Sequence, residues 1–182
     1  MACNSLITQG FALDCADSVG GVETIYIANL SEVTAFTESA GTISAITQAS
    51  GASIYEYQVE EQVADFVSTM QKNVENGTLY WETVLNFSID KLSAAKSEEI
   101  KLMAAARNLI VIIKGNDGNY YGLGFDKING EVGGAKLFGG TNQAASGAAF
   151  ADRSGYTLGI TAMEKHYPYL IDSAVVDGLT KA

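Results

Sequence analysis

Histidine and cysteine, the side chains most often used as bases, nucleophiles and metal ligands, are scarce in this sequence. His166 is the one histidine, and it lies beside the 167–169 segment Tyr-Pro-Tyr without companions at metal-ligand spacing. We therefore interpret it as a surface or interface side chain. Cys3 and Cys15 are the only cysteines. They could pair, but in a reducing compartment we interpret them as free thiols and assign them no chemistry.

Carboxylates are plentiful, and two of them could work as a general acid and base if the fold brought them together. Glu60, Glu61 and Asp65 form one group, and Glu98 and Glu99 form another. Runs of glutamate on a strand or helix are usually a solvated face. We predict no catalytic site, no metal site and no cofactor, and hence no enzyme.

The stretch LIVIIKGNDGNYYGLGF, residues 109–125, contains a polar segment, GNDGN at 115–119, that could be a metal-binding loop or a phosphate-binding loop. It has too few oxygen ligands for a calcium-binding loop and lacks the glutamate that ends such a loop. It also lacks the Lys-Ser/Thr pair that follows the glycines of a phosphate-binding loop. Asp117-Gly118 is a turn pair, and the aliphatic run before it is typical of a buried strand. The pattern predicts a β-hairpin.

Composition limits the remaining function classes. With 182 residues, 47% of them hydrophobic, the chain can bury the core of a single domain spanning residues 1–182. A net charge of −10 argues against tight binding to nucleic-acid backbone or to an anionic membrane. The sequence has no run of eighteen apolar residues and no signal-peptide pattern, so we expect folding in a cytoplasm.

Strand patterns dominate the first half of the chain. Residues 20–30 alternate with β-branched side chains and predict a first strand. Residues 31–51 are rich in Ser, Thr, Ala and Gly and predict a flexible connection, with a short strand near 42–46.

The 53–89 segment allows two interpretations. Val59, Val63, Val67 and their apolar neighbours are spaced as in a helix, whereas Ile54, Tyr55 and Tyr57 favour a strand. The Asn76-Gly77 pair leads into an alternating run whose one face holds six residues, and such a pair favours a type I′ turn. We predict a long hairpin rather than a helix. The six residues of that face are Leu79, Trp81, Thr83, Leu85, Phe87 and Ile89.

One helix is expected at 91–108, where Ala, Lys, Glu and Leu dominate. Ser93 can cap its start, Ile100, Met103 and Ala104 form an apolar seam, and Arg107 suits the last turn. Residues 129–155, nearly all small and polar, predict a long flexible loop with a strand at 135–138. Residues 155–171 resume the alternation as a closing strand pair.

This order of elements resembles the tail-tube and related ring proteins of tailed bacteriophages. The resemblance rests on TLYWETVLNFSIDKL, SAAKSEEIKLMAAARN, LIVIIKGNDGNYYGLG and DRSGYTLGITAMEKHYPYLI, and CADSVGGVETIYIANLSEV is similar to the start of such proteins in Bacteroides phages. It implies a mainly β (α+β) fold, in which a two-sheet antiparallel β-sandwich or half-barrel carries one flanking helix and a long hairpin. It also implies six copies per ring, stacked rings and DNA in the lumen.

The resemblance further implies a virion location in the tail or neck, assembly in the host cytoplasm, contacts with other tail or neck proteins, and DNA passage without tight binding or a membrane. The hairpin of residues 58–73 and 78–89 would join subunits, the helix would dock on the sheets, and the 129–155 loop would contact an adjacent ring. Strands that extend past a small domain leave edges that need a partner, and ring closure removes them. The hairpin residues are Val59, Val63, Val67, Glu75, Asn76, Gly77, Leu79, Trp81 and Leu85; the docking residues are Ile100 and Met103; the loop residues are Gly133, Gly134, Phe138, Gly139 and Gly140.

Three alternatives stay open. Another β-rich virion part, such as a head-decoration, connector or fibre-base protein, would share the composition. A carbohydrate-binding sandwich would need exposed aromatics in one groove, for which Trp81, Tyr55 and Tyr57 are candidates. A hydrolase with a flexible lid would need the nucleophile and base that the sequence does not offer.

Overall fold

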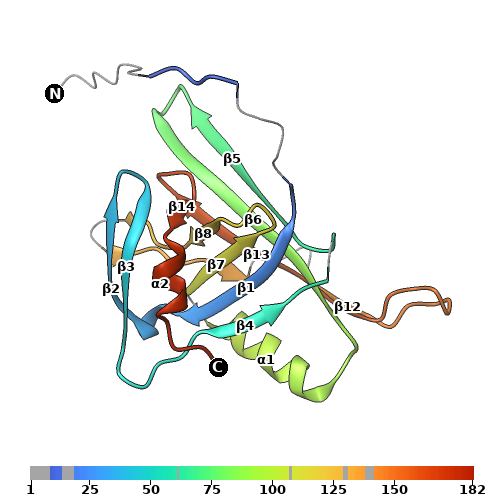
Figure 1. The fold of residues 1–182 in the computed structure, drawn as a ribbon. Helices are drawn as coiled ribbons and strands as arrows, with labels where there is room; N and C mark the ends of the chain where they lie inside the picture. Colours follow the sequence, from blue (N-terminus) through green and yellow to red (C-terminus); the bar gives the residue numbers. More distant parts are fainter. Residues whose placement is uncertain (1–8, 14–18, 61, 107, 129–130, 138–141) are drawn as a thin grey trace.

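A computed structural model describes residues 9–13, 19–60, 62–106, 108–128, 131–137 and 142–182 of the chain. It is mainly β, as expected, with two main sheets packed face to face as a sandwich (Figure 1). The strands are β1 (Val22–Asn29), β2 (Val33–Ser39), β3 (Thr42–Gln48), β4 (Tyr55–Gln58), β5 (Asp65–Asn73), β6 (Thr78–Asp90), β7 (Leu109–Gly115), β8 (Tyr120–Leu123), β9 (Lys127–Ile128), β10 (Glu131–Val132), β11 (Lys136–Leu137), β12 (Gln143–Ala145), β13 (Gly155–Glu164) and β14 (Tyr169–Ile171). The helices are the 3-10 turn η1 (Leu30–Glu32), α1 (Ala94–Ala105) and α2 (Ser173–Asp177).

The larger sheet has seven strands in the order β2-β3-β14-β8-β7-β1-β4. All neighbours are antiparallel except β14 and β3. Its inner strand β7, between β8 and β1, is buried on both faces, which explains the continuous aliphatic run of residues 109–113. One face packs on the smaller sheet. The other face is covered by α2 and by side chains of β2 and β3, which are strands of the same sheet. Phe36 of β2 reaches Phe125, with ring centroids 5.3 Å apart in an edge-to-face contact.

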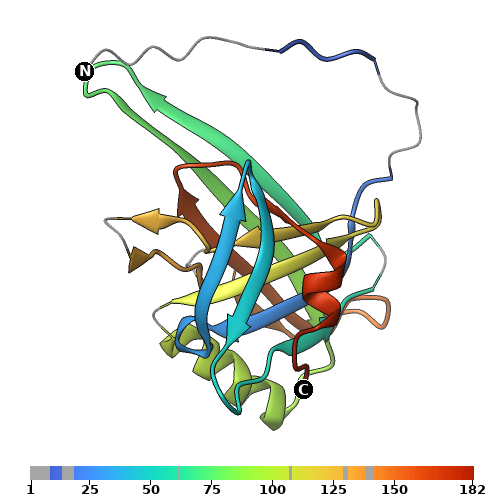
Figure 2. The ribbon, with the colours of Figure 1, turned by 60° about the vertical axis from the view of Figure 1, so that its left-hand side comes forward.

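The smaller sheet is built on the β5–β6 hairpin, with β13 beside β6, and β11 and β12 along the far side of β13. The inner row of β6, which includes Leu85 and Phe87, packs with Leu158 and Ile160 of β13 in the core between the sheets. Beyond that core the hairpin continues past the body of the molecule, as both views show (Figures 1 and 2).

The strand interpretation of the 59–74 region is confirmed for β5, but the predicted start of the hairpin is wrong. Residues 55–58 form β4, which pairs with β1 in the larger sheet, and residues 59–64 connect the two sheets. The hairpin therefore begins at Asp65. Its turn is also not the expected two-residue type: Asn73 pairs with Thr78 across a four-residue loop, and positive φ occurs at Gly77 and not at Asn76.

The short strand predicted near 42–46 is observed as β3, but the rest of the 31–51 segment is not the expected loop. It forms the β2–β3 hairpin, in which Ser39 pairs with Thr42 across Ala40 and Gly41. Both turn residues have positive φ, 51° and 83°, as a type I′ turn requires. The turn type predicted at Asn76-Gly77 therefore occurs here.

The second half of the chain agrees more closely with the elements predicted from the sequence. The helix is confirmed, and its N-cap is Ser93, whose hydroxyl accepts a 3.3 Å hydrogen bond from the Lys96 backbone N–H. The strand expected at 135–138 is observed as β11. The closing strand pair is split, because β13 lies in the smaller sheet and β14 in the larger one. Within the described residues, no helix combines the length and apolarity needed to cross a membrane.

Candidate assembly interface

The projecting β5–β6 hairpin carries a group of exposed apolar side chains. β6 has 13 residues, which at about 3.3 Å per residue gives a length of about 43 Å, twice that of a usual sandwich strand. Near the tip, the larger sheet does not cover the inner row, so Met70 and Leu79 are exposed together with Val67 and Tyr80. Val74 in the tip loop is 85% exposed. The hairpin thus exposes apolar area far from its own core.

The outer edge of this hairpin has no strand beside it in the described part of the chain. β5 is the last strand of its sheet and pairs only with β6, without a register shift from Asp65 to Asn73. The opposite edge, along β13, is covered by β12 at 155–157 and by β11 at 160–161, and between them the Gly159 N–H donates to Asn142 Oδ1 at 2.7 Å, so that only residues 162–164 of β13 have no described strand beside them. The β5 edge along its length, and the 162–164 end of β13, therefore leave backbone N–H and C=O groups available for another strand.

The outer face of the smaller sheet is acidic. Alternation from the buried row places Asp65, Glu82 and Asp90 on this face, together with Thr, Ser, Asn and Gln and with the apolar side chains of Val67, Tyr80, Val84 and Met163; the outer rows of β5, β6 and β13 contain no lysine or arginine. Nearby cations are Lys136 of β11 and Arg153, whose Nε lies 2.6 Å from Asp90 Oδ1. Such a face offers little to grip phosphate groups.

The residues predicted to join subunits through the hairpin differ in where the structure places them. Glu75, Asn76, Gly77, Val67 and Leu79 are exposed on the hairpin, as an intersubunit role needs, and Trp81 is half-buried at the edge of the core. The prediction is wrong for Leu85, which is fully buried between the sheets of its own chain. It is also wrong for the place of Val59 and Val63, which are half-buried in the connection before β5.

The two residues predicted to dock the helix both lie on its packed side. Met103 is buried in the intersheet core and Ile100 packs against the same cluster. Ala104, expected in the seam, is exposed, and Arg107 lies outside the described residues.

The glycines of the 129–155 segment have an internal role where they are described. Gly133 N–H donates to the Asp126 carbonyl and Gly134 N–H to the Gly124 carbonyl, at 2.9 and 3.2 Å. A Cβ at Gly134 would lie 2.6 Å from Asn108 Cβ, and its φ is +69°. These contacts hold the segment on its own chain. Phe138, Gly139 and Gly140 lie outside the described residues.

The carboxylates considered for catalysis are dispersed. Asp65 is on β5, Glu98 and Glu99 are on α1, Glu60 is in the connection, and Glu61 lies outside the described residues, as do both cysteines. Glu98 pairs with Lys101 at 3.2 Å. In the described part of the chain, no three His, Cys, Asp or Glu side chains are placed to hold a metal ion.

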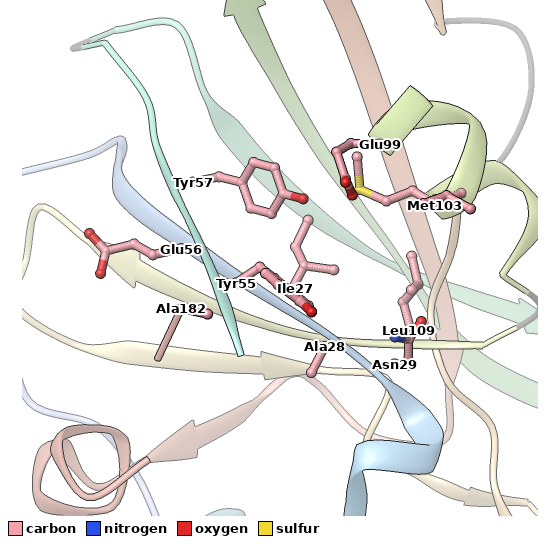
Figure 3. A pocket seen from close by; sticks show the side chains of 11 residues that line it. Ile27, Ala28, Asn29, Tyr55, Glu56, Tyr57, Glu99, Met103, Leu109 and Ala182 are labelled. Carbon is pink, nitrogen blue, oxygen red and sulfur yellow. The ribbon is translucent and has the colours of Figure 1, made fainter. Parts of the chain in front are cut away.

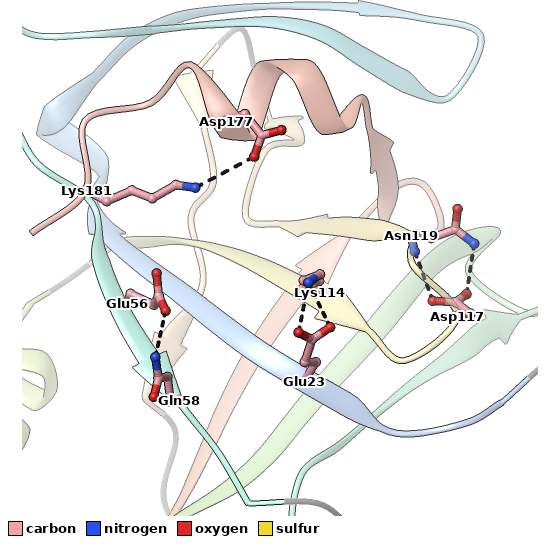
Figure 4. A network of polar contacts seen from close by, with 8 residues as sticks. All are labelled: Glu23, Glu56, Gln58, Lys114, Asp117, Asn119, Asp177 and Lys181. Atoms are coloured by element: carbon pink, nitrogen blue, oxygen red, sulfur yellow. Dashed lines mark hydrogen bonds and ion pairs between the residues drawn. The ribbon is translucent and has the colours of Figure 1, made fainter.

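The polar segment GNDGN at residues 115–119 is a turn, as predicted. Asp117 accepts hydrogen bonds from the Asn119 backbone and the Asn119 amide (Figure 4). It also accepts one from the Tyr121 hydroxyl at 2.6 Å. Burial opposes ionisation, but the hydrogen bonds from Tyr121 and Asn119 outweigh it and lower the pKa of Asp117. Figure 4 also shows the Glu23–Lys114, Glu56–Gln58 and Asp177–Lys181 contacts, which brace the same sheet and its C-terminal segment.

Two buried acids, missed in the sequence, link the sheets where the chain passes from β13 to β14. Glu164 is 3% exposed; its Oε1 accepts hydrogen bonds from the Gly124 and Asp126 N–H groups at 2.9 and 3.3 Å. In return, Asp126 accepts one from the Lys165 N–H. Glu164 Oε2 has no hydrogen-bond partner among the described residues. Burial, with a contribution from the Asp126 charge, raises the pKa of Glu164 to about 7.

A signal for Glu164 was present. The alternation of Tyr156, Leu158, Ile160 and Ala162, extended by two residues, places Glu164 on the buried face. His166 lies just beyond it, exposed, with its ring centroid 5.9 Å from that of Tyr169. It borders a pocket of about 430 Å³ that also contains Glu38 and Asp126.

A pocket of about 410 Å³ lies between β4 and α1 (Figure 3). Tyr57 from β4 points across it towards Glu99 and Met103 of α1, and Tyr55 lies lower on the same strand. Burial and the Glu99 carboxylate raise the pKa of Tyr57, which keeps its hydroxyl neutral. Trp81 does not line this pocket. The structure therefore brings together two of the three aromatics considered for carbohydrate binding, but not the third.

Comparison of the chain with protein-family models, with curated proteins and with solved structures finds no match. The features that any function must explain are therefore those of the chain itself. They are the free edge of β5, the apolar hairpin tip and the acidic outer face of the smaller sheet.

Proposed function

We propose that this chain is a virion structural protein whose copies close into a ring, or into stacked rings, in the tail or neck of a tailed bacteriophage. Six copies form each ring, as the sequence resemblance implies, and DNA passes through the channel. The observation that carries this proposal is the unpaired edge of β5 on a hairpin that extends past its own domain.

The edge of β5 lacks the protection usual in monomeric proteins. Natural edge strands are kept from pairing by proline, by bulges, by inward charges or by being short. β5 has nine residues, contains no proline, and pairs with β6 without a bulge. Its single lysine, Lys72, is on the inner row opposite Leu79, but it lies one residue from the end next to the tip and so leaves the rest of the edge unprotected. Such an edge is suited to accept a strand from another copy.

Ring closure would satisfy both edges of the smaller sheet. If β5 of one copy pairs beside the uncovered 162–164 end of β13 of the next, the contact joins two different surfaces and repeats until the ring closes. The inner-row residues Met70 and Leu79, which their own larger sheet leaves exposed, would then be covered by the neighbouring copy.

The charge on the outer face fits a DNA channel. In a ring joined through the smaller sheets, Asp65, Glu82 and Asp90 would face the lumen. Binding of proteins to DNA depends on neutralising phosphates with lysine and arginine. Because the outer rows of β5, β6 and β13 contain neither, DNA can pass without being held.

A matched pair of variants tests the proposal. Thr69→Lys places a charge in the middle of β5, and Thr34→Lys places the same charge on β2, the edge strand of the other sheet. We expect the wild-type chain and Thr34→Lys to form particles several times the 19.2 kDa monomer mass, and Thr69→Lys to remain monomeric. Light scattering coupled to size exclusion measures the masses. A wild-type chain that remains monomeric at millimolar concentration would refute the proposal.

A further inference from the structure

Residues 9–13, which we call the arm, present two large apolar side chains to solvent. Phe11 is 97% exposed and Leu13 is 102% exposed, and the arm pairs with no strand in the described part of the chain. The spacing of two residues places both side chains on one face when the arm is extended. The arm contains no charged side chain and no proline, so every backbone N–H in it can pair. It therefore has the properties of a strand without a partner.

Residues 19–21, at the root of the arm, are fixed beside the start of β5. The Asn116 N–H donates to the Gly21 carbonyl at 3.1 Å, and Asn116 Nδ2 donates to the Gly20 carbonyl at 3.0 Å. A pocket of about 270 Å³ is bordered by this root and by residues 65–66 of β5. The arm lies at the end of the molecule towards which the hairpin projects, in both views (Figures 1 and 2). The unpaired edge of β5 therefore begins next to the root of the arm.

The other open edges of the described sheets are less suited to receive the arm. β2 pairs with two register shifts, β4 has four residues, and β13 is uncovered only at 162–164. Short or bulged edges resist the addition of a strand. β5 has nine residues in an unbroken register. It is therefore the edge that an extended segment of this chain fits best.

The two loop side chains with comparable exposure, Phe150 and Val74, belong to tight turns. In the loop that carries Phe150, Asp152 Oδ2 accepts from two backbone N–H groups, both at 2.8 Å. In the tip loop that carries Val74, Asn73 Oδ1 accepts from a backbone N–H at 2.9 Å. Neither segment is extended, so neither can pair along a strand edge as the arm can.

We propose that residues 11–13 of the arm pair antiparallel with residues 70–72 of β5 in the same chain, and that they cover this part of the edge until a neighbouring copy displaces them. Six residue steps separate Leu13 from Val19, and six separate Gln71 from Asp65, so the arm reaches Met70 from its root with one step to spare. Because a short connection tethers the arm, its effective concentration at the edge is on the order of millimolar. At lower protein concentrations, the chain's own arm is favoured over that of a second copy.

In this register the two apolar side chains of the arm join the inner row of the hairpin. Leu13 lies opposite Met70, and Phe11 lies opposite Lys72, whose ammonium can rest over the phenylalanine ring. Met70 is 55% exposed, and Leu79, the β6 partner of Lys72, is 47% exposed. The seated arm therefore covers apolar area that the larger sheet leaves open.

The acids near this seat are far enough apart to tolerate it. The residue that follows the seat is Asp14, and the hairpin acid closest to that end is Glu82 on β6. Two strand spacings separate an added strand from β6, which is about 10 Å, and salt screens exposed charges over this distance. Asp65, the one acid of β5, lies at the base of the strand and outside the 70–72 segment.

The covered edge gives the arm a regulatory role, and this role rests on the assembly proposed above. A neighbouring copy joined through β5 would cover Met70 and Leu79, the same side chains that the seated arm covers. Arm and neighbour therefore compete, and assembly begins only when the neighbour wins.

Disulfide trapping within one chain tests the seat. In a Cys3→Ser, Cys15→Ser background, Leu13→Cys is combined with Met70→Cys, its proposed partner, or with Gln71→Cys, on the other row. Directly opposite residues of one row bring their Cβ atoms within disulfide range. We expect an intramolecular disulfide, separated from dimers on a non-reducing gel, to form about ten times faster with Met70→Cys than with Gln71→Cys. Equal rates, or disulfides only between chains, would overturn the inference.

A second measurement tests the regulatory role separately from the proposed function. Phe11→Ser, Leu13→Ser removes the apolar face of the arm and should lower the concentration needed for half-assembly about tenfold. Gln9→Ser, Ala12→Ser, the matched control in the same arm, should behave as the wild type. If the wild type assembles and both double variants match it, the arm is refuted as a regulator and the ring proposal stands. If none of the three assembles, the ring proposal is refuted, and the disulfide rates still decide whether the arm occupies the edge.

Discussion

Replacing Glu164 by glutamine should change how the stability of the fold depends on pH. The buried carboxylate has a pKa of about 7 in the folded protein, against an ordinary value of 4.5. The folded state therefore binds this proton more tightly than the unfolded state does. Between pH 4.5 and pH 7 the folded state holds more protons, so the free energy of unfolding falls as pH rises. Well above pH 7 the group is deprotonated in both states, so the free energy of unfolding stays lowered by the full cost of the buried charge.

The size of the effect follows from the pKa shift. A difference of about 2.5 pKa units, at about 1.36 kcal/mol per unit, corresponds to about 3 kcal/mol. Because Glu164 Oε2 has no partner to compensate its charge among the described residues, this cost is not offset locally. Glutamine has nearly the same shape and does not titrate, and its oxygen can still accept from the Gly124 and Asp126 N–H groups.

Urea unfolding of dilute protein at pH 5, 6, 7 and 8, followed by circular dichroism, measures the effect. We expect the stability of Glu164→Gln relative to the wild type to rise by about 2.5 kcal/mol from pH 5 to pH 8, because a small part of the full effect has already occurred at pH 5. Glu82→Gln, on the outer row of the same sheet, should not reproduce this rise. If the difference between Glu164→Gln and the wild type stays constant over this pH range, the assignment of a raised pKa to Glu164 is incorrect.

Three further predictions follow from the placement of individual residues. Leu85→Ala should lower the free energy of unfolding by about 2–5 kcal/mol in urea titrations, because Leu85 is fully buried between the sheets; a loss below about 1 kcal/mol would contradict that placement. Deletion of residues 75–78 should prevent assembly, measured by light scattering, while the circular dichroism of the fold is kept; large particles from this variant would argue against the hairpin as the joining element. His166→Ala should leave assembly intact, since this exposed side chain borders the pocket with Glu38 and Asp126 and is not part of β5; monomers from this variant would show that His166 belongs to the interface.

Local patterns in the sequence predicted elements, and the partners of those elements were harder to predict. Alternation in 78–90 identified β6 and the row that faces the core, and the cap at Ser93 identified the start of α1. The same kind of pattern led to the wrong prediction that β4 belongs to the hairpin, because Tyr55 and Tyr57 favour a strand but do not show which sheet the strand joins. Only the six-residue connection at 59–64 separates the two, and it has no glycine or proline to mark a boundary.

Two other misses have different causes. The β2–β3 hairpin turns at Ala40-Gly41, where alanine adopts positive φ at a cost that makes it a rare choice for this position. The Glu164–Asp126 link depends on where the chain crosses between sheets, and spacing along the sequence does not show that two acids 38 residues apart meet there. The continued alternation of β13 was the one usable signal, and it concerned Glu164 alone.

Electron microscopy of the purified full-length chain tests most directly whether copies complete one another through the edge of β5. We predict class averages of closed rings or short tubes with a central channel and sixfold symmetry, in which the smaller sheets of adjacent copies are continuous around the channel. Particles without a channel, or rings in which β5 faces solvent and not a neighbouring strand, would contradict the account.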